Sequence, residues 1–185
     1  MKKISKKKLT ELNKLVSIDK IRKIIQILRD PDGGCPWDLK QDYNSIAPYS
    51  IEEAYELIDA IEKNDINEIK SELGDLLLQV VLISQIASDQ GDFNFDDVAD
   101  EISQKIIRRH PQIFDQNYKI NDLPQESWER IKNLEKKNKH NPNKSTLDQI
   151  ENNMPTILKS LKIQKKAASL NFDWISKDRV LKKVD

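Results

Sequence analysis

Apolar side chains recur every three or four positions between residues 17 and 109 of this 185-residue chain. This spacing places them along one face of an α-helix, whereas a half-buried strand would show strict alternation. No Asn-Gly or Asp-Gly pair lies between alternating apolar runs, and the chain has only 4 glycines and 6% aromatic residues. The pattern therefore predicts an all-α fold.

Residues that favour helix ends mark where the predicted helices begin and stop. Ser50, followed by Glu53, and Asp65, followed by Glu68, fit the capping-box pattern, in which two side chains satisfy the free backbone donors of the first turn. With Ser17 and Asn94 as further caps and Pro111 as a stop, we predict helices at 17–29, 50–62, 65–91 and 94–109, and further helix starts at Pro124, Pro155 and Ser176.

One stretch of the third predicted helix is apolar on nearly every side. In residues 76–83, LLLQVVLI, only Gln79 is polar. Such a run also suits a buried strand, but the helical pattern on both sides and the cap at Asp65 favour a helix. Because this helix needs neighbours on every side, we predict a four-helix bundle that is completed by a second copy of the chain.

Composition divides the chain into four segments. Residues 1–16 form a basic extension, 17–132 the helical domain, and 133–153 a Lys- and Asn-rich linker; 154–185 form a short helical segment. Residues 31–38, PDGGCPWD, read as a turn-rich loop within the helical domain.

The net charge is zero, with 31 basic and 31 acidic side chains, but the charges are unevenly distributed. Residues 1–49 carry 11 basic and 6 acidic groups, residues 50–101 carry 2 and 15, and residues 102–185 carry 18 and 10. Overall neutrality argues against a general nucleic-acid binder or a polybasic membrane-surface protein. With the single cysteine Cys35, and with no secretory or membrane-spanning run, it favours a cytoplasmic protein.

Five acidic residues within the central block have a specific spacing. Glu52, Glu53 and Glu56 lie on one predicted helix, and Glu72 and Asp75 lie on the next. Residues three or four apart are neighbours on a helix surface, so each helix presents a group of carboxylates on one face. An antiparallel hairpin of the two helices brings these groups face to face.

Such a cluster needs a counter-ion. Two carboxylates about 5–6 Å apart repel by roughly 3 kcal/mol at an effective dielectric constant of about 20, and only Lys63 and Lys70 are nearby in the sequence. Oxygen ligands without His or Cys suit Mg²⁺ first and Mn²⁺ second, and Mg²⁺ recruits phosphate oxygens. The alternative for any single residue is an ordinary capping or solvated role, as for Glu52 and Glu53 in a helix first turn.

Several motifs resemble one protein family. GGCPWD, IAPYSIEEAYELIDAIE, SELGDLLLQVV, IIRRHPQIF and KIQKKA with FDW are similar to the MazG-type nucleoside triphosphate pyrophosphohydrolases, which belong to the all-α NTP pyrophosphatase superfamily. The resemblance covers roughly residues 17–175. It implies a homodimeric helical bundle that binds Mg²⁺ and cleaves NTP or dNTP to NMP and pyrophosphate, in nucleotide-pool house-cleaning. It also implies that residues 154–185 lead toward a second MazG-like domain that is absent here.

The resemblance also assigns roles to individual residues. The implied metal ligands are Glu53, Glu56, Glu72 and Asp75, with Glu52 in contact with the metal or the nucleotide. Glu52 or Glu53 is the candidate general base. The family's basic motif falls on Lys105, Arg108 and Arg109, and Trp128 is the candidate for contact with the base. Lys105 and Arg109, four residues apart, suit a phosphate clamp, although they also suit a solvated basic helix end.

Two other functions compete with the enzyme. One is a non-catalytic dimerisation and nucleotide-binding module of a two-domain protein. The other is nucleic-acid binding through the basic residues 2–8 and 136–144, which the zero net charge disfavours.

Overall fold

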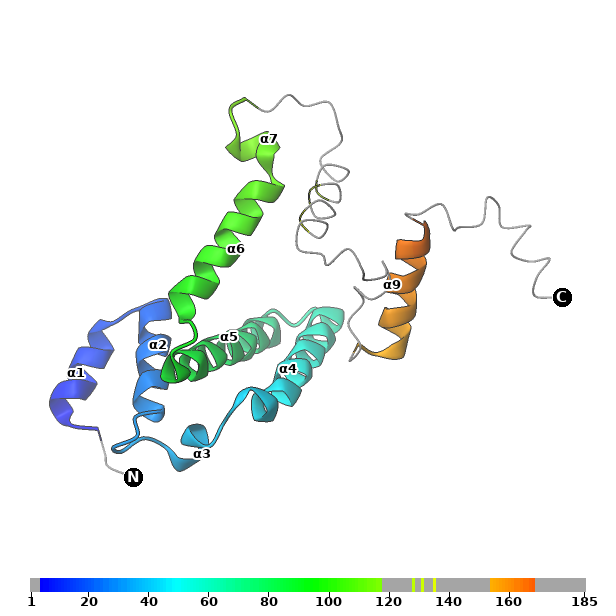
Figure 1. The fold of residues 1–185 in the computed structure, drawn as a ribbon. Helices are drawn as coiled ribbons and strands as arrows, with labels where there is room; N and C mark the ends of the chain where they lie inside the picture. The colour runs from blue at the N-terminus through cyan, green and yellow to red at the C-terminus, as the bar shows by residue number, and fades with distance from the viewer. Residues whose placement is uncertain (1–3, 118–127, 129–130, 132–134, 136–153, 169–185) are drawn as a thin grey trace. The chain divides into compact units, whose positions relative to one another are not determined.

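The computed structural model describes residues 4–117, 128, 131, 135 and 154–168, which fall into two units, residues 1–118 and 119–185 (Figure 1). The elements of the first unit are α1 (Lys6–Lys14), α2 (Ser17–Leu28), α3 (Pro36–Leu39), α4 (Tyr43–Lys63), α5 (Ile66–Gln90), α6 (Phe95–Arg109) and α7 (Pro111–Phe114); α9 (Thr156–Ala168) belongs to the second. No strand occurs among the described residues, so the predicted all-α fold is confirmed.

Two predicted helix starts match the structure because the capping side chains bond as expected. The Asp65 carboxylate accepts hydrogen bonds from the backbone N–H groups of Asn67 and Glu68 at the start of α5. Asn94 caps α6 together with Asp97 in a capping box. Gly91, in the left-handed conformation at φ 78°, ends α5.

The predicted start of the second helix at Ser50 is wrong. Helix α4 begins seven residues earlier, where Asp42 and Ser45 exchange hydrogen bonds in a capping box. Ser50 therefore lies inside the helix. Pro48 is also inside, in the second turn, where a proline removes one backbone donor and its ring crowds the carbonyl four residues earlier. The capping pattern at Ser50 was a coincidence that a stronger cap upstream overrides.

The N-terminal region also differs from the prediction. Val16 occupies the N-cap position of α2 and Ser17, at φ 49°, is its first residue, so Ser17 makes no side-chain cap. The predicted basic extension contains helix α1, which packs on α2. The loop predicted at 31–38 contains the single turn of α3. Within that loop Gly34 leaves no room for a side chain, since a Cβ would collide with the backbone carbonyl oxygens of Leu28 and Asp30.

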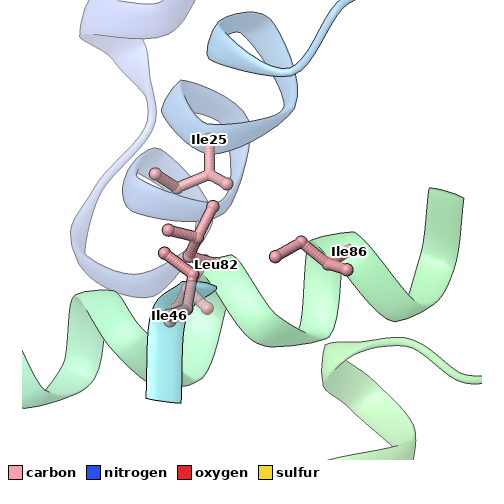
Figure 2. Packing of buried hydrophobic residues seen from close by; sticks show 5 residues of the cluster. Ile25, Ile46, Leu82 and Ile86 are labelled. Atoms are coloured by element: carbon pink, nitrogen blue, oxygen red, sulfur yellow. The ribbon is translucent and has the colours of Figure 1, made fainter. Parts of the chain in front are cut away.

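Helix α5 is the central element of the first unit, because α4, α2 and α6 all pack against it. Figure 2 shows the centre of the core, where Ile25 of α2, Ile46 of α4, and Leu82 and Ile86 of α5 lie close together. Each is at most 4% exposed, and burying one such side chain contributes about 1.5–3 kcal/mol. The predicted burial of the apolar run in this helix is thus confirmed on the side that faces α2.

A buried arginine fixes the loop between α2 and α4. The Arg29 side chain is 8% exposed and forms an ion pair with Asp89 of α5 at 2.7 Å. Its guanidinium also donates to the backbone carbonyls of Asp38 and Gln41. The segment that contains α3 is therefore attached directly to the central helix.

The second unit is described only in part. Helix α9 begins directly after Pro155, as predicted. Trp128, Ile131 and Glu135 are helical. The predicted helix starts at Pro124 and Ser176, and nearly all of the linker predicted at 133–153, lie outside the described residues. No described helix is both long and apolar enough to cross a membrane.

Candidate metal centre

The carboxylates of the central acidic block meet where α4 and α5 pack as an antiparallel hairpin. The hairpin turns at Asn64, which adopts the left-handed conformation at φ 56°, and Asp65 caps the returning helix. Glu53 and Glu56 lie on α4, and Glu72 lies on α5. One carboxylate oxygen from each of these three lies within 4.8 Å of the others. The face-to-face arrangement predicted from the helical spacing is therefore present for these three residues.

Burial and mutual repulsion disfavour the ionised forms of these acids. The pKa of Glu53 is raised above its ordinary value of 4.5, first by burial and then by the charges of Asp75 and Glu56. A hydrogen bond from Gln79 partly offsets this rise. The pKa of Glu72 is raised by burial, by the charges of Glu56, Asp75 and Glu53, and by a hydrogen bond with Glu56, which needs a proton on one of the two carboxyls.

Asp75 and Glu52 lie at the edge of this group. Asp75 is half-buried, and its charge raises the pKa of both Glu53 and Glu72. Glu52 is exposed, and its charge makes the smallest contribution to the raised pKa of Glu53. Neither belongs to the three-residue group whose oxygens meet within 4.8 Å.

The donor set fits a hard divalent cation. Four described basic residues form ion pairs with acids outside the cluster: Arg22 with Asp96, Arg29 with Asp89, Lys63 with Asp59 and Lys105 with Glu101. Three carboxylates with no His or Cys beside them are typical ligands for Mg²⁺ or Mn²⁺. A cation held here would relieve the repulsion that raises the pKa values of Glu53 and Glu72.

The basic residues predicted to bind phosphates lie on another helix. Lys105, Arg108 and Arg109 are in the C-terminal half of α6, and Lys105 forms an ion pair with Glu101 at 3.5 Å. Figure 1 shows α6 running away from the α4–α5 hairpin. Trp128 is half-buried and helical but belongs to the second unit, so it is not placed relative to the carboxylates.

Gln79 is a site residue that sequence reasoning missed. It is 8% exposed, and its side-chain amide nitrogen lies 3.4 Å from a carboxylate oxygen of Glu53. The available signal was its position: it is the single polar residue in an apolar run, four residues after Asp75 and hence on the same helix face.

Comparison with known proteins identifies the segment that carries these carboxylates. Residues 41–114 match the family described as the MazG nucleotide pyrophosphohydrolase domain. The chain contains a MazG domain. The resemblance inferred from the motifs is thereby confirmed.

Relatives of known name extend the match beyond the MazG domain. A nucleoside triphosphate pyrophosphohydrolase of Escherichia coli (strain K12) is 43% identical over 168 residues, which are 90% of this chain and 63% of that protein. The nucleoside triphosphate pyrophosphohydrolase/pyrophosphatase MazG of Thermotoga maritima is 36% identical over 170 residues, 92% of this chain and 64% of that protein. The chain therefore spans a little under two thirds of the length of these relatives.

A solved structure shares the fold. The crystal structure of a mazG-related protein from Thermotoga maritima superposes with a TM-score of 0.51 at 23% sequence identity, covering 63% of this chain and 99% of that one. At this identity the likeness supports the helical fold of the MazG domain and nothing more specific.

Proposed function

We propose that this protein is a divalent-metal-dependent nucleoside triphosphate pyrophosphohydrolase. The observation that carries the proposal is the carboxylate group Glu53, Glu56 and Glu72, which lies inside a MazG domain and offers three oxygen ligands within 4.8 Å of one another. Relatives whose similarity extends over about nine tenths of this chain are named for this activity. The reaction adds water across the α–β phosphoanhydride of an NTP or dNTP and releases NMP and pyrophosphate, which suits a role in cleansing the nucleotide pool.

Each acidic residue has a proposed part in this chemistry. Glu53, Glu56 and Glu72, with Asp75 beside them, hold Mg²⁺, or Mn²⁺ in its place. A bound divalent cation lowers the pKa of water and neutralises charge on phosphate oxygens. Glu52 lies outside the three-residue group, which leaves its carboxylate available to accept the proton of the attacking water.

Self-association is the second part of the proposal. Three helices carry apolar side chains that are at least 41% exposed in the single chain: Ile51, Tyr55 and Ile58 on α4, Leu73, Leu77 and Val80 on α5, and Ile102 and Ile106 on α6. Exposed apolar stripes of this kind mark interaction surfaces. A second copy packed on these stripes completes the bundle and surrounds the carboxylates with further helices. In that assembly Lys105, Arg108 and Arg109 bind the phosphate tail of the nucleotide, and Trp128 contacts its base.

The enzyme proposal is tested by pyrophosphate release from a panel of NTPs and dNTPs with Mg²⁺. Glu53→Gln removes one metal ligand, so we expect at least a 100-fold lower rate, since even outer-shell changes at metal sites cost about 10–100-fold. Asp59→Asn is the matched control, because Asp59 lies on the same helix but pairs with Lys63 instead. Absence of pyrophosphate from every nucleotide would overturn the proposal.

The association proposal is tested by light scattering coupled to size-exclusion chromatography. Leu77→Lys places a charge in the exposed stripe of α5, and we expect it to convert a dimer into monomers. Val16→Lys is the control, because Val16 is 71% exposed but lies outside the three stripes. A wild-type protein that elutes as a monomer at every concentration would contradict this part.

A nucleotide-binding module without turnover is the alternative function. It is favoured by one observation: α6, which carries the three basic residues, runs away from the α4–α5 hairpin within a single chain. Thermal stabilisation by nucleotide and Mg²⁺, with no pyrophosphate released, would support the module over the enzyme.

A further inference from the structure

Gln79 is a polar side chain buried beside the carboxylate group. It lies on α5 four residues after Asp75 and seven after Glu72, so the three share one helix face. It is the single polar residue of the apolar run 76–83, and only 8% of Gln79 is exposed. A buried amide in such surroundings is retained when its hydrogen-bonding groups have partners.

Only one end of this amide has a partner within the protein. The side-chain nitrogen donates to a carboxylate oxygen of Glu53 across the hairpin, at 3.4 Å. The side-chain oxygen is buried and accepts no hydrogen bond. Ser84, the other buried polar residue of α5, differs in this respect, since its hydroxyl donates to the carbonyl of Val80 at 2.8 Å.

The orientation of the amide follows from the charge of Glu53. An ionised carboxylate only accepts hydrogen bonds, so it attracts the NH₂ end of Gln79 and repels the oxygen end. The oxygen is then left needing a donor. The Glu53 carboxylate beside the amide is an acceptor when ionised, so it supplies no donor, and none of the ion pairs formed by Arg22, Arg29, Lys63 and Lys105 involves it. The donor that this chemistry calls for is a water molecule held at the site.

We infer that Gln79 is a positioning residue of the metal centre: it holds the Glu53 carboxylate from one end and accepts a hydrogen bond from a metal-bound water at the other. The inference rests on the proposed function and deepens it. Mg²⁺ keeps several waters when proteins bind it, and side chains that orient ligands and waters tune the affinity for the metal.

The test is a calorimetric titration of the full chain with Mg²⁺, and separately with Mn²⁺, in the absence of nucleotide. Gln79→Met keeps the length and bulk of the side chain but removes both the donor and the acceptor. We expect about 10-fold weaker binding of the cation or more, with a metal-free Tm equal to that of the wild type or higher. Ser84→Ala, a buried polar change on the same helix, should leave the affinity unchanged.

A second measurement is made on the wild-type protein, and a variant serves only to assign the resonances. In ¹⁵N-labelled wild-type protein the two amide protons of the Gln79 side chain give a resonance pair, identified as the pair that is missing in Gln79→Met or, if that variant does not fold, Gln79→Leu. Saturating Mg²⁺ should shift this pair and slow its exchange with solvent. Because the amide donates to Glu53, the shift alone reports metal binding, whereas slower exchange is the change that a purely structural glutamine would not show.

The outcomes separate the two proposals. If wild-type protein binds Mg²⁺ and Gln79→Met binds it equally well, or if Mg²⁺ does not slow the exchange of the resonance pair, Gln79 is not a positioning residue, while the proposed function stands. If the wild type binds no divalent cation at all, the metal centre is wrong and the inference falls with it.

Discussion

The two halves of α5 have opposite effects on folding. The N-terminal half carries Glu72 and Asp75, which face other carboxylates. The C-terminal half carries Leu82 and Ile86, which are at most 4% exposed within the apolar core. Gathering like charges opposes folding, and removing apolar surface from water favours it. A single helix thus joins a carboxylate group whose repulsion opposes folding to the apolar core that compensates for it.

This contrast explains why the carboxylate group depends on the apolar core. Carboxylates that repel one another remain together only because α4 and α5 are fixed by contacts elsewhere along the same helices, such as Ile46 against the core. Functional sites of this kind are stabilised by the rest of the structure rather than by their own interactions. Changes in each half should therefore alter stability in opposite directions.

The largest effect is expected from the apolar half. Ile86→Ala leaves a cavity at a fully buried position, so we expect the free energy of unfolding to fall by about 2–5 kcal/mol. Urea unfolding followed by circular dichroism measures the change. Ile86→Val removes a single methylene group and should cost about 0.5–1.5 kcal/mol. Equal stability of Ile86→Ala and wild type would show that the core is not centred on α5.

In the polar, N-terminal half of α5, removing a side-chain charge should raise the stability of the fold instead of lowering it. Glu72→Gln removes one repelling charge, so in chelating buffer we expect this variant to have a higher Tm than the wild type. Adding Mg²⁺ at 100 times its dissociation constant should stabilise the wild type by about 2.7 kcal/mol and the variant far less. Differential scanning fluorimetry with and without Mg²⁺ measures both changes. A lower Tm for the metal-free variant would show that the cluster does not oppose folding.

The smallest effect is a dependence on pH. The pKa values of Glu53 and Glu72 are raised above 4.5 in the folded protein, so the folded state binds their protons more tightly than the unfolded state does. Their contribution to stability is fully present below about pH 4.5 and is lost as the pH rises through the raised pKa values. In metal-free buffer, the stability of the wild type relative to Glu72→Gln should therefore increase from pH 7 to about pH 5. A constant difference between the two proteins would contradict the raised pKa values.

Local chemistry explains which parts of the fold were predictable. Asp65 and Asn94 cap backbone groups only two or three residues away, so the sequence contains both partners of each hydrogen bond. Ser50 matched the same pattern but lies inside α4, because Asp42 and Ser45 form a capping box earlier in the chain. A local pattern alone does not reveal which of two competing caps the helix uses.

For the candidate site, too, the local spacing was predictable and the long-range packing was not. Glu53, Glu56 and Glu72 were grouped correctly because helical spacing and a hairpin are both readable from the sequence. The distance between Lys105 and these carboxylates was not readable, since it depends on how α6 packs in three dimensions. Gln79 was missed because its importance depends on its burial beside Glu53. Burial is a property of the folded chain and cannot be read from one polar letter in an apolar run.

The continuity of α5 also fixes how the chain tolerates changes in length. Glu72 and Leu82 lie on one uninterrupted helix, in which each residue turns the next by about 100°. One residue inserted between them would rotate the acidic face away from α4 while the core stayed in place, or the reverse. A substitution in this segment changes one side chain and leaves the acidic face aligned with α4. An insertion or deletion changes the angle between the acidic face and the core face of the helix.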